Sequence, residues 1–159
     1  MAGYPLGVAR PWVSGRFGLI DALDGPLANT AAWQLLLDGQ RPLFTELLDG
    51  ATVALVARTV ADAGAGPMLA WVAQDGRMTA RPSTFAGYRD TVADLFMVFP
   101  EDTLAGLDPA AADPFGDLRD GLREGNIMLF VMRTKSDLID RGWEDFCESL
   151  GLAFMGACR

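Results

Sequence analysis

The sequence predicts an α+β fold. We expect one domain over residues 12–159, preceded by an extended arm over 1–11, with a mixed, mostly antiparallel sheet of five or six strands and helices packed on it. Short apolar runs rich in β-branched residues alternate with segments of helical periodicity. The pair Asp75-Gly76 between two such runs indicates a β-hairpin, because a two-residue turn needs positive φ and these residue types tolerate it. Half of the 159 residues are hydrophobic, which is enough for an ordinary core.

The first third of the chain is expected to be mainly helical. Residues 12–20 are interrupted by glycines and predict a bent strand. Pro26 favours the first turn of a helix, and Gly39 is placed to end it. A second short helix is predicted over 42–48, so that the two helices form a hairpin with apolar side chains available for burial.

The middle of the chain contains most of the expected strands. Their common feature is a run of apolar residues between turn signals. Pro82 would end the second strand of the hairpin and place it near a sheet edge, because proline donates no hydrogen bond to a ladder. The strands are predicted over 51–59, 68–74, 77–81, 93–99 and 126–133, with helices over 101–107 and 114–123.

The C-terminal part predicts one helix followed by a last strand. Thr134 is a helix-capping residue, and Gly151 is placed to end the helix. Between them, apolar residues recur at helical spacing, which gives the helix one buried face. Residues 152–157 would then return to the sheet as a strand, through a right-handed crossover.

The charge distribution disfavours two classes of partner. The net charge is −8, and residues 90–159 carry fourteen acidic against six basic residues. Such a surface repels phosphate, so we expect neither nucleic acid nor an anionic membrane as a partner. The sequence contains neither an apolar run long enough to span a membrane nor a secretory signal at its N-terminus, and a cytoplasmic location is expected.

The lack of histidine restricts the chemistry. Without a His residue, a Ser-His-Asp or Cys-His site cannot be built from this chain, and zinc sites with imidazole ligands are excluded. Cys147 and Cys158 do not have the spacing of a CxxC motif and are expected to be free thiols. We therefore assign no catalytic residue, no metal ligand and no cofactor.

The first candidate site is an acidic helix face. Asp140, Glu144 and Glu148 follow one another at four-residue steps and would form one column of carboxylates. Such a column could dock a basic partner or hold a divalent cation, or it could be the solvated side of an amphipathic helix. Our main expectation is a non-catalytic accessory or protein-interaction domain, able to form homo-oligomers, that uses these three residues for contact.

The second candidate site lies near the hairpin. Arg77 and Arg81 are four residues apart on one predicted strand and would point to the same face. They could clamp a carboxylate or phosphate, or pair with acids on a neighbouring strand. Trp12, beside the N-terminal arm, could line an apolar pocket. The alternative function is therefore a small-molecule-binding protein with an apolar pocket and an arginine anchor.

The third alternative is an enzyme that works without histidine, through carboxylates or a metal ion. Paired carboxylates can act as acid and base when burial raises the pKa of one of them. Asp94, Glu101 and Asp102 stand near predicted strand ends and would be the best carriers of such an activity. This alternative is placed last, because most acidic residues fall on a predicted helix surface.

Overall fold

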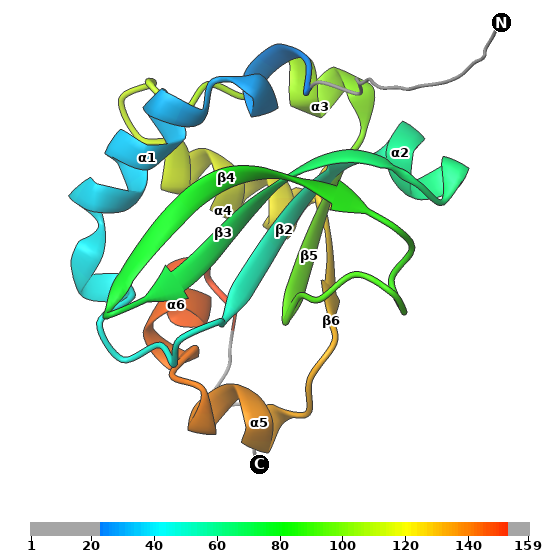
Figure 1. Ribbon diagram of the computed structural model, residues 1–159. Coiled ribbons are helices and arrows are strands. Elements are labelled where there is room, and N and C mark those ends of the chain that lie inside the picture. The colour runs from blue at the N-terminus through cyan, green and yellow to red at the C-terminus, as the bar shows by residue number, and fades with distance from the viewer. Residues whose placement is uncertain (1–22, 153–159) are drawn as a thin grey trace, which may run out of the picture.

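The computed structural model describes residues 23–152 of the chain (Figure 1). Three predicted features lie outside the described residues: the arm over 1–11, the bent strand over 12–20 that begins with Trp12, and nearly all of the last strand, over 152–157. Within them, one mixed sheet with helices packed on it confirms the predicted α+β class. No helix in this part of the chain is long and apolar enough to span a membrane.

Five strands of the described region form the sheet, in the spatial order β4-β3-β2-β5-β6 (Figure 1). They are β2 (Thr52–Ala57), β3 (Gly66–Gln74), β4 (Arg77–Phe85), β5 (Leu95–Phe99) and β6 (Met128–Val131). β2 and β5 are parallel, whereas the other neighbouring pairs are antiparallel. The β3-β4 hairpin turns at Asp75 and Gly76, both at positive φ, as the Asp-Gly pair predicts.

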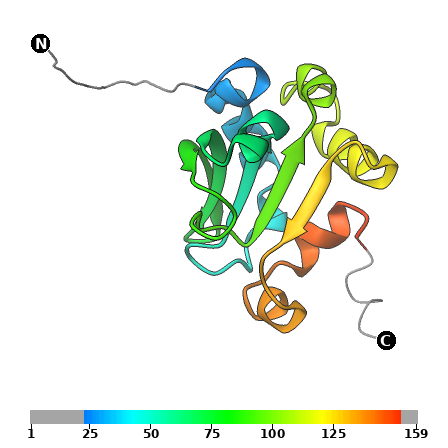
Figure 2. The same cartoon turned by 90° about the vertical axis from the view of Figure 1, so that its right-hand side faces the viewer.

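The helices lie mainly on one face of this sheet. Figures 1 and 2 show α1, α4 and α6 on the same side of the strands. The helices are α1 (Thr30–Gly39), α2 (Arg58–Ala63), α3 (Glu101–Ala105), α4 (Pro114–Glu124), α5 (Lys135–Asp140) and α6 (Glu144–Ser149), with 3-10 turns over Gly25–Ala28 and Arg41–Leu43. Asn29, Asp113 and Thr134 cap α1, α4 and α5, because each side chain accepts a hydrogen bond from the backbone N–H three residues on.

The main core fills the space between these helices and the inner face of the sheet. Inward-facing strand residues such as Leu55, Trp71 and Met97 meet the buried sides of the helices. The ring of Trp71 lies 5.7 Å from that of Trp33 and 6.3 Å from that of Phe146. Aromatic pairs at such distances stabilise a core beyond the area that they bury.

The opposite face of the sheet, here called the outer face, has a thinner cover. A smaller apolar cluster lies on it, made of Ala54, Val56, Met68, Ala70, Phe85, Ala93 and Phe96. The loop over 86–94 folds back onto this face and is held by a hydrogen bond from the Ala86 N–H to Thr91 Oγ1, at 2.8 Å. Tyr88 of this loop packs edge-on against the aromatic rings of the cluster. Because a loop covers this face in place of a long helix, part of the outer face stays open.

The edge strand β4 is protected by a side chain of α1. Gln34 Nε2 donates to Met78 O at 3.0 Å, and Gln34 Oε1 accepts from the Ala80 N–H at 2.8 Å. Pro82 lies on the same outward side of the ladder, so its missing N–H removes no ladder bond and β4 continues to Phe85. The prediction of an edge position is confirmed, but the predicted end of the strand at Pro82 is wrong.

The predicted single C-terminal helix is wrong. The chain forms two short helices, α5 and α6, around a turn at Gly142. Gly142 has a φ of +87°, and a Cβ at this position would collide with the carbonyl oxygen of Glu46. The helix therefore breaks where another segment, far away in the sequence, approaches the backbone closely.

Two further elements differ from the prediction in detail. The first helix begins at Thr30, after a 3-10 turn that contains Pro26, because Asn29 supplies a side-chain cap. Residues 44–46 form a turn and 47–48 have no regular structure, so the second predicted helix is reduced to the 3-10 turn that ends at Leu43.

Candidate functional site

A groove of about 420 Å³ opens on the outer face, between the strands and the loop over 86–94. Its floor is apolar, because alternate residues of β3 point to this face: Met68, Ala70 and Val72. The full lining consists of Gly50, Thr52, Met68, Ala70, Val72, Arg81, Ser83, Thr84, Asp90, Thr91 and Val92. An apolar floor with a few polar groups at the rim is typical of small-molecule sites of this volume.

The strand register explains why a hollow exists here and why Arg81 stands beside it. Ala70 of β3 lies opposite Arg81 of β4 on one side and opposite Ala54 of β2 on the other. Side chains that face one another across a ladder point to the same side of a sheet. The small side chain of Ala70, which lines the groove, leaves space above β3 next to the long side chain of Arg81.

The two arginines that were predicted to act together have different surroundings. Arg77 forms a bidentate ion pair with Asp38 of α1, from Nε at 3.0 Å and from Nη2 at 3.1 Å. The hydrogen bond from Arg77 lowers the pKa of Asp38, and the same bond raises the pKa of Arg77. Arg81 forms no hydrogen bond or ion pair with any residue between 23 and 152, and it lines the groove. Only Arg81 is therefore available as an anchor for a ligand.

Aromatic side chains extend the apolar surface of the outer face beyond the groove. The ring of Tyr88 lies 5.1 Å from the rings of Phe96 and Phe130. Phe130 is 39% exposed, and Val92 at the groove wall is 81% exposed. Burial against these rings raises the pKa of Tyr88, with a smaller contribution from Asp62. The Tyr88 hydroxyl is therefore protonated at neutral pH and can donate a hydrogen bond at this face.

A second polar assembly is centred on Asp94, which is 2% exposed. Its Oδ1 accepts from Arg133 Nε at 2.9 Å, and its Oδ2 accepts from Arg141 Nε at 3.0 Å and from Trp143 Nε1 at 2.9 Å. A carboxylate that is removed from water needs such donors, because an unpaired buried charge is costly. With both oxygens engaged, Asp94 has the environment of a structural group.

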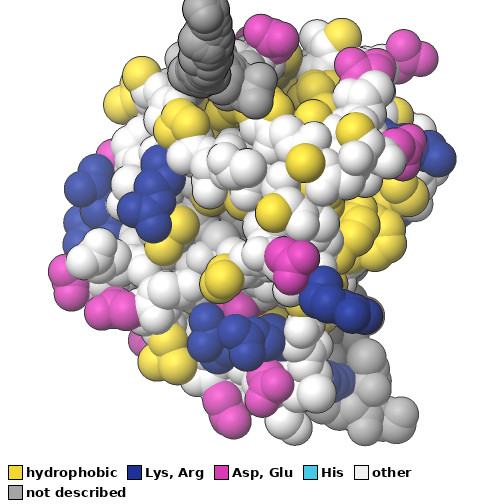
Figure 3. Space-filling model, turned by 45° about the vertical axis from the view of Figure 1, so that its right-hand side comes forward, with side chains coloured by type: hydrophobic (Ala, Val, Ile, Leu, Met, Phe, Trp, Pro, Cys, Tyr) yellow, Lys and Arg dark blue, Asp and Glu magenta, His cyan; other side chains and the backbone are white. Residues whose placement is uncertain are grey.

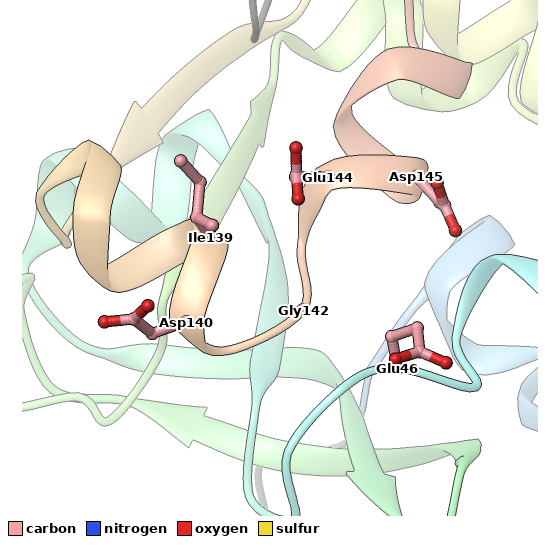
Figure 4. A pocket seen from close by; sticks show the side chains of 6 residues that line it. All are labelled: Glu46, Ile139, Asp140, Gly142, Glu144 and Asp145. Atoms are coloured by element: carbon pink, nitrogen blue, oxygen red, sulfur yellow. The ribbon is translucent and has the colours of Figure 1, made fainter.

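The predicted acidic column does not form one helix face. Asp140 ends α5 and Glu144 begins α6, while Glu148 lies near the end of α6. The first two border a hollow of about 320 Å³. That hollow is lined by Glu46, Ile139, Asp140, Gly142, Glu144 and Asp145. Figure 4 shows its carboxylates pointing in different directions, and within residues 23–152 no group of three or more acids or cysteines is placed to hold a metal ion.

The remaining sequence candidates lie apart from the groove. Glu101 and Asp102 form the first turn of α3, where Glu101 Oε2 accepts a hydrogen bond from Thr59 Oγ1 at 3.0 Å. Cys147 is a free, buried thiol of α6. Burial raises the pKa of Cys147 to about 11, with a smaller contribution from Glu148. The thiol is therefore protonated at neutral pH and is a poor nucleophile.

Two features of these sites were not predicted from the sequence. The groove wall made of Asp90, Thr91 and Val92 has no local signal, because a polar loop does not indicate which face of a sheet it will cover. The pairing of Asp94 with two arginines was also missed. A signal was present, since Asp94 follows directly on Ala93 in an otherwise apolar run, where a carboxylate needs partners.

Comparison with known proteins finds no matching family model and no matching curated protein. Two solved structures match. One is described as the crystal structure of sterol carrier protein 2; it is 17% identical, with 79% of this chain and 92% of that chain covered and a TM-score of 0.44. The other is a conserved hypothetical protein of Thermus thermophilus whose description names a possible sterol carrier protein; it is 14% identical, with 82% and 92% covered and a TM-score of 0.41.

Our main expectation, an accessory or protein-interaction domain, is corrected at this point. The acidic column of Asp140, Glu144 and Glu148, which motivated the expectation, is broken between α5 and α6.

Proposed function

We propose that this protein binds a small amphipathic anion in the groove on the outer face of its sheet. The observation that carries the proposal is Arg81, a guanidinium beside an apolar floor, without an ion-pair partner among residues 23–152. Such a guanidinium attracts a carboxylate or phosphate and binds it through charge-assisted hydrogen bonds. The apolar part of the ligand would lie on Val72 of the floor and against Val92 of the loop wall.

The rim of the groove supports a ligand with one anionic group. Ser83 and Thr84 follow Arg81 along β4 and supply hydroxyls beside the guanidinium. Asp90 stands in the loop wall of the same groove and would repel a second negative charge. We therefore expect a monoanion with a polar neighbour group to bind more tightly than a dianion with the same apolar part.

Calorimetric titration with decanoate and decanol tests the proposal. The two probes have the same apolar chain, so the difference between their affinities reports the charged group. A hydrogen bond to a charged group contributes about 1.5–3 kcal/mol, so decanoate should bind at least about tenfold more tightly. Arg81→Gln should abolish this difference while leaving the decanol affinity unchanged.

Arg77→Gln is the matched control, because Arg77 points to the same face of β4 but is engaged by Asp38. This variant should keep the preference for decanoate. Ser83→Trp, which fills the groove from an exposed position, should lower the affinity for both probes. Equal affinities for the two probes, no binding of either, or equal losses in the two arginine variants would contradict the proposal.

A further inference from the structure

We infer that Arg133 and Arg141 form an anion site outside the groove, which binds a phosphate group on the solvent side of Asp94. The starting point is an imbalance of charge. Two guanidiniums share the single carboxylate of Asp94, at 2.9 and 3.0 Å. Within residues 23–152, neither arginine has another acidic side chain at ion-pair distance. Among the described residues, the cluster therefore keeps one positive charge that no acidic side chain pairs with, although the whole chain is acidic.

The mode of contact leaves hydrogen-bond donors available. Arg133 and Arg141 each contact Asp94 through Nε alone, whereas Arg77 uses both Nε and Nη2 on Asp38. Each guanidinium has five N–H donors. The Nη groups of both arginines make no hydrogen bond to any residue of the described part, so they can serve a ligand.

The two arginines reach solvent, while the carboxylate that holds them does not. Their side chains are 40% and 21% exposed, against 2% for Asp94. Figure 3 shows a compact group of basic side chains at the end of the molecule where α5 lies, with acidic side chains next to it. Asp137 and Asp140 of α5 lie between the two arginines in the sequence, but they form an ion pair with neither.

The arrangement fits a tetrahedral phosphate better than a planar carboxylate. Each carboxylate oxygen of Asp94 accepts a hydrogen bond from a different arginine, so the two guanidinium groups approach from separate directions. A single guanidinium group is enough to bind a carboxylate, whereas a phosphate has enough oxygens to accept hydrogen bonds from both guanidinium groups. Asp94 already fixes both Nε atoms, which reduces the entropy lost when a ligand binds. The phosphate could be free, esterified or part of a lipid headgroup.

Titration with inorganic phosphate, followed by NMR of the arginine Nε–Hε groups, tests the inference. The signals of Arg133 and Arg141 should shift saturably with phosphate and not with chloride at the same ionic strength. Arg133→Lys and Arg141→Lys each keep the positive charge but lose the guanidinium group that donates two parallel hydrogen bonds. The phosphate affinity of each variant should therefore fall about tenfold. Arg41→Lys, at an exposed arginine outside the cluster, is the control and should change nothing.

Vesicles of phosphatidylcholine, with and without phosphatidic acid, provide the lipid form of the phosphate. A saturable response to either phosphate source that both lysine variants weaken supports the site and identifies its ligand. No response of the wild-type protein to either source, or an equal loss in Arg41→Lys, overturns it. A response that Arg81→Gln removes and Arg133→Lys retains assigns the phosphate to the groove, which overturns this site and leaves the proposed groove function standing.

Discussion

Trp143 Nε1 donates a hydrogen bond to Asp94 Oδ2 at 2.9 Å, inside the protein. Trp143 is fully buried in the main core, and Asp94 stands immediately before β5, an interior strand of the sheet. The bond therefore attaches the turn between α5 and α6 to the sheet. Because α5 and α6 are each only six residues long, their positions depend on such tertiary contacts and not on helix propensity.

Asp94→Asn should destabilise the protein by about 3 kcal/mol, because breaking a buried ion pair on one side has such a cost. The Asn amide nitrogen would also face a donor, Arg Nε or Trp Nε1, where the carboxylate now accepts. Urea unfolding followed by tryptophan fluorescence measures the change. Asp90→Asn, at an exposed position on the same loop, is the control and should stay within about 0.5 kcal/mol of the wild type. Equal effects of the two substitutions would contradict a special role of Asp94.

Trp33→Phe should lower the free energy of unfolding by about 1–2 kcal/mol more than Trp71→Phe does. Both indoles are fully buried, so the two substitutions remove a similar volume. Trp33 Nε1 donates to Pro26 O at 2.8 Å, whereas Trp71 Nε1 has no hydrogen-bond partner among residues 23–152. Parallel denaturant titrations of the two variants give the difference. If Trp71→Phe lowered the free energy of unfolding more than Trp33→Phe, the prediction would be wrong, and the indole N–H of Trp71 would need a hydrogen-bond partner outside residues 23–152.

Gly142→Ala should be more destabilising than Gly125→Ala. Both glycines have φ near +80°, at +87° and +81°, so both substitutions share the backbone strain of about 1–2 kcal/mol. A Cβ at Gly125 meets no atom within 4 Å, but a Cβ at Gly142 collides with the carbonyl of Glu46. The collision should add about 1–3 kcal/mol, as overpacking does. Thermal unfolding of both variants checks this order, and equal melting temperatures would be evidence against the close approach of the two segments.

Protein stability should decrease as the pH rises from about 9 to about 11. Burial raises the pKa of Cys147 from 9.0 to about 11, so in this window the folded protein keeps a proton that the unfolded chain has lost. Stability from this group is thus complete below pH 9 and is lost toward pH 11, with a slope of at most about 1.4 kcal/mol per pH unit. The raised pKa of Tyr88 acts in the same direction. Cys147→Ala should therefore show a smaller decrease than the wild type in urea unfolding at each pH, and an unchanged slope would refute the assignment to Cys147.

Local sequence patterns predicted most of the sheet. The Asp75-Gly76 turn, the apolar runs of β2 and β5 and the helix cap at Thr134 act between residues that are neighbours in the chain. Such short-range preferences can be recognised without knowing the fold. The mixed, mostly antiparallel sheet with its hairpin strand at an edge followed from them.

The candidate sites were predicted less well, because each depends on residues from separate segments. Arg77 and Arg81 share a strand face, as expected, but Asp38 of α1 engages only Arg77. The acidic column of the last helix depended on an unbroken helix, and Glu46 approaches Gly142 where the helix would have continued. Neither outcome is visible in a local pattern.

The sequence by itself determined the class of the fold, the order of its strands and helices along the chain, and the chemistry excluded by the lack of histidine. The tertiary structure alone decided that Asp94 joins Arg133, Arg141 and Trp143. It also decided that Arg81 lies opposite the small side chain of Ala70, without an ion-pair partner among residues 23–152. The physical reason is the separation along the chain over which each kind of interaction acts. Turn, cap and periodicity preferences act over a few residues, whereas the partner of a charge is set by which distant segments the packed core brings together.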